Sequence, residues 1–244
     1  MKIALSVATA LIMTTLFAVP LVDLNFFIEP QFEQDFDVEL ITQSTVNDTI
    51  PQINIAAGRI FSESVSDSLF LYNLDLMEID YASPVGFKFG YDTVEFETEI
   101  ISANVISDSL AYQRSIVIPL DGYTIGFTSI YTPDYAVKFS IDEKSEFRFD
   151  IFDIAAKQSQ YLSHFADLVI MLSNAGLYID RDLVQGLPVD VMLSFDYQTY
   201  KNRILNSGRT NYYSIRSDTG NFGKLRIFQR EDELHYEWSV HQFK

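Results

Sequence analysis

Alternation of apolar and polar residues at every second position is the feature that most constrains this chain. Between residues 21 and 150 it recurs in short stretches separated by proline and other turn residues. Side chains of a strand point alternately to its two faces, so this period predicts strands with one face in the core and an acidic face in water. The apolar members of three such stretches are Leu24, Phe26 and Ile28, then Phe36, Val38 and Leu40, then Val94, Phe96 and Ile100.

The period changes between residues 153 and 175. Apolar residues there recur at spacings of three and four, which predicts an amphipathic helix of about six turns. Asp153 is the expected N-cap, and Asn174-Ala175-Gly176 supplies a glycine stop.

Strands are expected again after the helix, at 177–179 and 189–195. The last 35 residues read as a three-strand meander, with Ile215 in its first strand, Leu225 in its second and Trp238 in its third. If residues 225 and 238 pair, Arg226 lies opposite Glu237 on the outer face. The predicted fold is mainly β (α+β), with an antiparallel β-sandwich-like region, one long helix and a C-terminal meander. The predicted parts are a β domain over 23–150 and a helix-plus-meander part over 151–244, which together form one domain or two.

Residues 1–22 form a predicted signal peptide or membrane anchor. Lys2 is followed by an uncharged apolar run that ends before Asp23, which is the pattern of a secretory leader. The run is also close to the length that spans a bilayer, so a retained anchor is the alternative. We therefore expect an exported protein of the periplasm, cell surface or extracellular space.

The charge of the chain is unevenly distributed. Its net charge is −17, and residues 21–100 hold sixteen acidic residues against Arg59 and Lys88, whereas residues 201–244 hold eight basic and five acidic ones. Nucleic acid is an unfavourable partner for such a chain, because phosphate contact needs a cationic face. The chain also has no cysteine, which excludes disulfides, thiol nucleophiles and cysteine metal sites.

Motifs of catalysis are not evident in the sequence. It has no G-x-S-x-G elbow, no glycine-rich phosphate loop and only three histidines, His164, His235 and His241. His235 and His241 share one strand face but lie about 20 Å apart at the rise of a strand, too far to chelate one ion together. No cofactor is therefore expected, with calcium on the acidic strand faces as the one candidate.

These observations favour an exported, envelope-associated β protein that acts by binding or assembly and is not an enzyme. Its expected partner is another protein, a second copy, or a polyanion or polysaccharide, and an uncleaved leader would add the membrane. Two alternatives stay open: a secreted glycoside hydrolase that uses two carboxylates, and an outer-membrane β-barrel. The predicted contact residues lie in the basic C-terminal meander, and they are Arg216, Lys224, Arg226 and Arg230.

Overall fold

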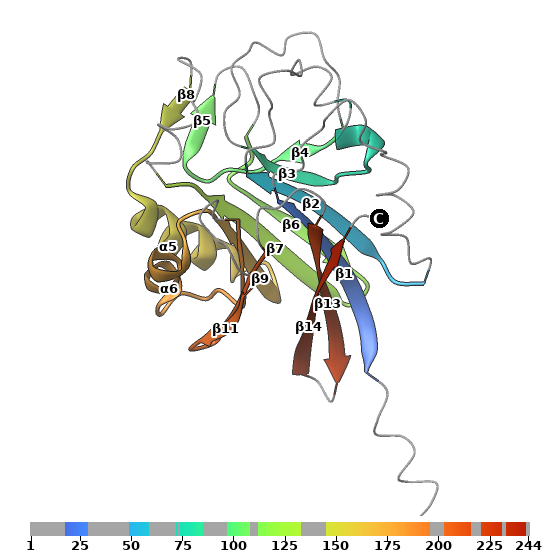
Figure 1. The fold of residues 1–244 in the computed structure, drawn as a ribbon. Helices are drawn as coiled ribbons and strands as arrows, with labels where there is room; N and C mark the ends of the chain where they lie inside the picture. Colours follow the sequence, from blue (N-terminus) through green and yellow to red (C-terminus); the bar gives the residue numbers. More distant parts are fainter. Residues whose placement is uncertain are drawn as a thin grey trace, which may run out of the picture.

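The computed structural model arranges most of its strands in two large mixed sheets (Figure 1). The structure describes residues 18–28, 49–58, 72, 74–84, 97–107, 112–132, 145–195, 203–215, 221–230 and 233–242. The predicted strand around Phe36 lies outside these residues, as does residue 94.

The first sheet joins the two ends of the described chain. Among the described residues it has six strands, in the order β14-β13-β1-β2-β3-β4. β1 pairs in parallel with β2, β2 with β3 and β3 with β4, whereas β13 is antiparallel to both β1 and β14. The strand bounds are β1 Val19–Ile28, β2 Gln52–Gly58, β3 Tyr81–Pro84, β4 Glu99–Ile100, β13 Asn221–Arg230 and β14 Glu233–Gln242.

The second sheet has a parallel centre with an antiparallel strand at each edge, whereas the antiparallel pairing of the first sheet lies on one side only. Its described strands follow the order β11-β12-β10-β9-β7-β6, and β12, β10, β9 and β7 run parallel to one another. The outer strands β11 and β6 are antiparallel to their neighbours. The strand bounds are β6 Ser115–Leu120, β7 Tyr123–Ile130, β9 Leu168–Ser173, β10 Val191–Ser194, β11 Arg203–Ser207 and β12 Thr210–Ser214.

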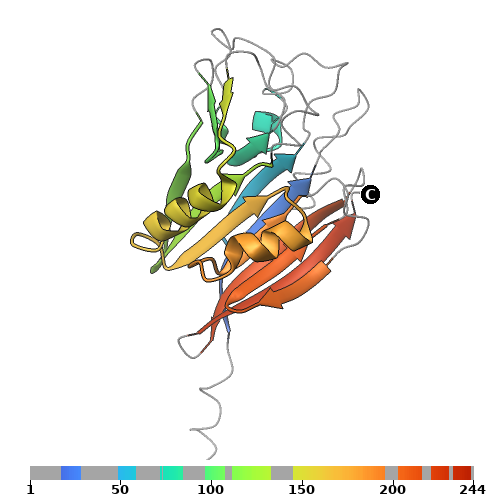
Figure 2. The ribbon, with the colours of Figure 1, turned by 90° about the vertical axis from the view of Figure 1, so that its left-hand side faces the viewer.

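Two helices, a short helical segment at residues 74–76 and a small two-stranded sheet lie outside the two large sheets. The helices α5 (Ile151–Leu162) and α6 (Leu177–Val184) lie side by side over one face of the second sheet (Figure 2). The strands β5 (Val105–Ser107) and β8 (Ser145–Phe147) form a two-stranded antiparallel sheet.

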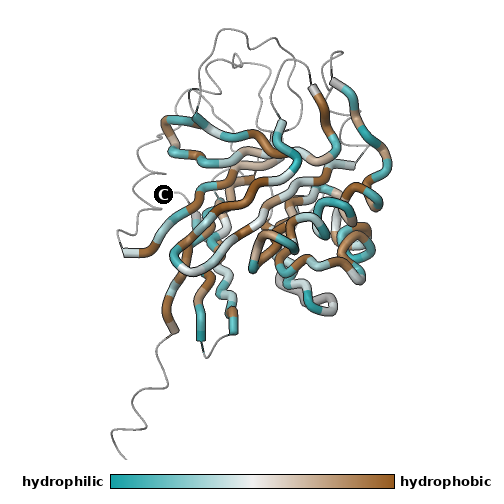
Figure 3. Tube along the Cα trace, turned by 180° about the vertical axis from the view of Figure 1, so that it is seen from behind, coloured by the Kyte–Doolittle hydropathy of each residue, from teal (hydrophilic) through white to brown (hydrophobic). Residues whose placement is uncertain are grey.

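The described residues include two large clusters of buried apolar side chains. The larger lies between the two sheets and includes Phe26, Ile55, Phe127 and Leu225. The second, with Met171, Met192 and Leu162, lies between the second sheet and the helices. Hydrophobic stretches accordingly follow the strands through the middle of the molecule (Figure 3). Burial of this much apolar surface is the main stabilising contribution to the fold.

The prediction of a mainly β chain is confirmed, but its arrangement differs from an antiparallel sandwich. Both sheets are mixed, and their central strands pair in parallel. The expected acidic water-facing side of the first strand is also wrong, because Asp23 and Asn25 in β1 are fully buried. Both side chains have partners inside the protein, because Asp23 accepts hydrogen bonds from Arg226 and Asn25 donates to Gln52 and Asn54.

The predicted six-turn helix over 153–175 is wrong in its second half. α5 ends at Leu162, and Leu168–Ser173 forms the buried strand β9. A short continuous apolar run fits a buried parallel strand as well as a buried helix, so periodicity does not separate them. The expected N-cap is also displaced, because α5 starts after Asp150.

Two further predictions in the C-terminal half are corrected. The strand expected at 177–179 belongs to α6, and the expected meander is divided between the sheets. Only β13 and β14 form a hairpin in the first sheet, whereas β12 belongs to the second. The predicted register of that hairpin is confirmed, because Leu225 pairs with Trp238 and Arg226 with Glu237.

The segment predicted as a leader, residues 1–22, overlaps the first strand of the fold. β1 begins at Val19 and Val22 is buried, so the last four residues of the expected leader 1–22 belong to the first sheet. None of the helices in the described part of the chain has the length and apolar character needed to cross a membrane. Each large sheet combines strands from both of the expected parts, 23–150 and 151–244.

Candidate functional site at the carboxyl ends of the parallel strands

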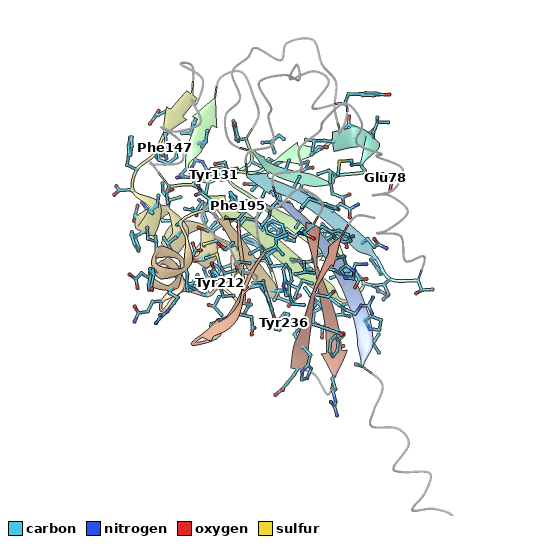
Figure 4. The ribbon with its side chains drawn as sticks, in the orientation of Figure 1. Glu78, Tyr131, Phe147, Phe195, Tyr212 and Tyr236 are labelled. Carbon is cyan, nitrogen blue, oxygen red and sulfur yellow. The ribbon has the colours of Figure 1, made fainter. Side chains whose placement is uncertain are left out.

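The carboxyl ends of the parallel strands in the two sheets meet at one end of the molecule. Ser83, at the end of β3, contacts Ser129 and Tyr131, at the end of β7. Tyr131 in turn packs edge-on against Phe195, which follows β10, with ring centroids 5.8 Å apart (Figure 4). Ligands of open sheets with parallel strands bind beyond the carboxyl ends of those strands, so this edge is the candidate site. We call it the strand-end edge.

A buried hydroxyl cluster ties the two sheets together at the strand-end edge. Ser83 Oγ donates to the carbonyl oxygen of Ile101 at 3.1 Å and lies 2.6 Å from Tyr131 Oη. Ser129 Oγ is also within hydrogen-bonding distance of Ser83 Oγ. Because Ser83 has one proton and two lone pairs, Ser129 and Tyr131 are assigned as the donors to it.

Tyr131 is held at its backbone as well as at its hydroxyl. The Asn104 amide donates to the Tyr131 carbonyl oxygen at 2.7 Å, and its Oδ1 accepts the Tyr131 N–H at 3.0 Å. Burial raises the pKa of the Tyr131 phenol well above its ordinary value. The phenol therefore stays neutral at physiological pH and serves as a hydrogen-bonding group rather than as a base.

A second row of polar residues lies where β9, β10 and β12 end. Ser173, Ser194 and Ser214 are register partners in adjacent parallel strands. They continue the side of the sheet that carries Met171, Met192 and Tyr212, so they face the helices.

Three polar atoms in this region are buried without a hydrogen-bond partner. They are Ser194 Oγ, Ser214 Oγ and Asn174 Nδ2. Asn174 Oδ1, in contrast, accepts the Thr132 N–H at 2.8 Å. Buried polar groups are nearly always satisfied, and an exception marks a place where water or a ligand completes the bonding.

The described residues of the strand-end edge do not fit a divalent metal ion. They offer hydroxyls, one phenol and amides, and they include no carboxylate, imidazole or thiolate, the groups that supply the charged and nitrogen or sulfur ligands of such sites. No cluster of three or more such ligands occurs among the residues that the structure describes. The described residues of the edge offer a ligand hydrogen-bonding groups. They include no ionised nucleophile and no acid–base pair.

A hollow of about 540 Å³ lies at the opposite end of the second sheet. It is lined by the loop before β10 and the turn before β12, with Arg181 and Arg209 among its residues. Arg209 is paired with Asp190. The hollow adjoins the amino ends of these strands and is therefore separate from the strand-end edge.

The described members of the predicted basic contact set all lie on β13, and two of them face a buried carboxylate. Arg226 donates two hydrogen bonds to the buried Asp23 carboxylate, at 2.8 and 2.9 Å, and Lys224 Nζ lies 3.7 Å from the same carboxylate. The hydrogen bond to Asp23 is the largest cause that raises the pKa of Arg226. Arg230 is exposed at the end of β13, and Arg216 lies outside the described residues.

The described site residues predicted from the sequence, Lys224, Arg226 and Arg230, do not belong to the strand-end edge. A signal was present, because Met171-Leu172-Ser173 and Met192-Leu193-Ser194 are two copies of one pattern, each ending a short apolar run. Two such runs with serine at the end indicate neighbouring parallel strands whose carboxyl ends meet.

Comparison with solved structures identifies related folds. The 5'-nucleotidase precursor of Thermus thermophilus has a TM-score of 0.70 and 15% identity, over 93% of this chain and 55% of that one. The Thermus thermophilus sulfate thiohydrolase SoxB gives 0.68 and 15%, over 84% and 42%. The NAD nucleotidase of Haemophilus influenzae gives 0.67 and 13%, over 93% and 50%.

At these identities the likeness concerns the fold, and the chain spans about half the length of the structures that it resembles. No protein family model matches the sequence, and no curated protein matches it.

These neighbours correct the prediction of a non-catalytic binding protein. All three are hydrolytic enzymes by name, and none is a glycoside hydrolase. The expectation that the protein is not an enzyme is wrong on the same ground. The expectation of no cofactor, or calcium alone, is corrected as well, because two of these neighbours are nucleotidases by name, and hydrolytic enzymes that act on phosphate esters commonly use divalent metal ions. The sequence was searched for local motifs, and a likeness to these enzymes is visible only in the three-dimensional fold.

Proposed function

We propose that the protein hydrolyses phosphate esters of the nucleotide class at the strand-end edge. In this reaction water adds across the phosphate ester bond and releases a nucleoside and inorganic phosphate. The observation that carries the proposal is the fold shared with two nucleotidases and a thiohydrolase over 84% to 93% of this chain. The proposal rests on fold analogy, because the described residues contain no complete catalytic set.

The position and polarity of the strand-end edge support the proposal. Ligands of parallel sheets gather at this end of the strands, and the edge carries buried hydrogen-bonding groups without protein partners. Asn104 and Ser83 hold the segment after β7 from two sides. A site built on strand ends and held by such contacts has the rigidity that positioning a substrate needs.

Phosphate release from adenosine 5'-monophosphate tests this function. The purified chain is expected to release phosphate from the monophosphate with saturable kinetics. The matched control is Leu172→Asp, which buries a charge in the centre of β9 and unfolds the second sheet. A folded wild-type preparation that releases no more phosphate than this control would refute the proposal, since the control carries the same trace of host phosphatases.

We also propose that the protein is exported. The apolar run after Lys2 supports this, as does the similarity to a 5'-nucleotidase described as a precursor. Because Val22 is buried in the first sheet, cleavage is expected at or before Val19. N-terminal sequencing of the protein recovered outside the cytoplasm of a bacterial host checks this. A mature chain that starts beyond Val22, or one that stays in the cytoplasm, would contradict it.

A further inference from the structure

A pair of aromatic rings lies at the same end of the molecule as the strand-end edge. Phe147, in β8, is half-buried against the larger core, and Figure 4 shows it at the same end as Tyr131. The ring of Phe149 packs edge-on against Phe147, with centroids 5.2 Å apart. Phe149 is nonetheless 69% exposed, so its ring is held by one neighbour and keeps apolar surface open to a ligand.

The two rings line a hollow of about 490 Å³, which we call the aromatic hollow. Its other walls come from the first turns of α5 and from the segments around Ala103 and Arg114. In the described part of the chain, the hollow at the opposite end of the second sheet has no aromatic side chain in its lining. Sites for small molecules are hollows of this order of size that combine aromatic walls with a few polar groups.

The aromatic hollow adjoins the strand-end edge through two consecutive residues. Ala103 lines the hollow, and its N–H donates to the carbonyl oxygen of Ser129 at 2.9 Å. Asn104 holds the backbone of Tyr131, and its own carbonyl oxygen accepts the Arg148 N–H at 2.8 Å. One stretch of backbone therefore has the buried hydroxyl cluster on one side and the aromatic hollow on the other, so a single ligand can reach both places.

The charged side chains in the described lining of the aromatic hollow balance one another. The three cations are Arg114, Arg148 and Lys157, and the three carboxylates are Glu146, Asp150 and Asp153. Lys157 and Asp153 are paired, with 2.6 Å between Nζ and Oδ2. A lining without net charge suits a neutral ring, and its carboxylates and guanidiniums can hydrogen-bond the amino and carbonyl groups at the rim of a nucleobase. The aromatic wall supplies a surface for the face of that ring.

We infer that the aromatic hollow binds the base of a nucleotide by stacking on Phe149, and so selects nucleotides over phosphate esters that lack a base. The sugar then lies toward Ala103, and the phosphate lies at the strand-end edge. The inference rests on the proposed function for the place of the phosphate. It adds the residue that determines specificity, which lies outside the edge itself.

Binding of adenosine 5'-monophosphate and of ribose 5-phosphate to the full chain, measured by calorimetry, tests the inference, because the two compounds differ by the base. We expect the monophosphate to bind about 10-fold more tightly, the order of effect that stacking one base on an aromatic side chain produces. Phe149→Ala should remove most of this difference and leave the affinity for ribose 5-phosphate unchanged, whereas Phe149→Tyr should retain it. Equal affinities of the wild-type chain for the two compounds, or a difference that Phe149→Ala leaves intact, would overturn the inference.

Phe165→Ala provides a matched control. Phe165 is 57% exposed and packs on one aromatic neighbour, Tyr161, with ring centroids 5.0 Å apart. It lies in the turn between α5 and β9 and does not line the aromatic hollow. This variant is expected to bind both compounds as the wild type does. The same loss in Phe165→Ala as in Phe149→Ala would assign the effect to exposed aromatic rings in general and would overturn the inference.

Adenosine, which has the base but no phosphate, separates failure of the inference from failure of the proposed function. Adenosine binding that Phe149→Ala removes, in a chain that releases no phosphate from the monophosphate, supports the inference and refutes the proposed function. Phosphate release from ribose 5-phosphate and from the monophosphate with equal kcat/KM supports hydrolysis of phosphate esters and overturns the inference. Absence of adenosine binding to the wild-type chain would likewise overturn it.

Discussion

At the scale of single residues, some buried polar groups of this protein have hydrogen-bond partners, and others have none. Ser83 accepts two hydroxyl donors and donates to a carbonyl, whereas Ser194 and Ser214 are as deeply buried without a hydrogen bond. A hydrogen bond contributes modestly to stability, but a buried group left without its partner costs more. The two kinds of serine should therefore respond differently to substitution.

Ser194→Ala is expected to leave the free energy of unfolding unchanged or to raise it by about 1 kcal/mol, because it removes an unsatisfied hydroxyl. Ser83→Ala is expected to lower it by about 1–3 kcal/mol, because the hydroxyls of Ser129 and Tyr131 lose their acceptor. Urea unfolding of the two variants measures both changes. Equal losses would show that Ser194 has a partner that it needs for stability.

A second prediction at this scale concerns the buried Asp23 carboxylate. Asp23→Asn removes the charge that Arg226 and Lys224 face, and their side chains are only 35% and 15% exposed. Breaking such a pair leaves cations without compensation, so we expect a loss of about 2–4 kcal/mol.

The control for this prediction is Asp153→Asn, which breaks the exposed ion pair with Lys157 in α5. It should cost no more than about 0.5 kcal/mol. Chemical unfolding compares the two variants, and similar small losses would mean that the Asp23 pair contributes little beyond its burial.

At the scale of elements, one apolar run formed a strand where a helix was expected. Leu168–Ser173 is buried along its whole length as β9, between β7 and β10. The same residues, placed after Ile154 and Leu162 in sequence, fit the spacing of a helix. Pairing with two neighbouring strands decides the matter, and neither neighbour adjoins this segment in the sequence.

The hairpin of β13 and β14 depends on a glycine that lies under an aromatic ring. A Cβ on Gly223 would lie 2.1 Å from Trp238 Cη2, far inside contact distance. Gly223→Ala is therefore expected to destabilise the protein by about 1–3 kcal/mol, because the indole has to move. Thermal unfolding measures the change.

A double substitution separates this clash from other effects of alanine at Gly223. With Trp238→Leu already present, the further cost of Gly223→Ala should become smaller, because the shorter side chain leaves room for a Cβ. An undiminished cost in that background would assign the effect to the backbone of β13 instead.

At the scale of the whole molecule, each sheet is assembled from distant parts of the chain. The hydrogen bonds between Arg226 and Asp23 span 203 positions, and β13 covers the edge of β1 with Leu225 and Ile227 in the shared core. The two predicted parts, 23–150 and 151–244, therefore contribute to one pair of sheets.

A chain that ends at residue 220 is expected not to fold cooperatively. It would expose the unpaired edge of β1, remove the cation partners of Asp23 and open the core between the sheets. Circular dichroism during thermal unfolding checks this. A truncated chain with a sharp transition close to that of the full chain would show that the C-terminal hairpin is an addition to an independent domain.

The sequence by itself determined the strand-rich character, the register of the final hairpin and the small number of nitrogen and sulfur ligands. These properties depend on composition or on residues close in the chain, such as the pairing of Arg226 with Glu237. Only the tertiary structure decided that β9 is a strand, that Arg226 binds Asp23 and that Ser83 meets Tyr131. Parallel pairing joins segments that are far apart in sequence, and a local pattern carries no record of which segments those are.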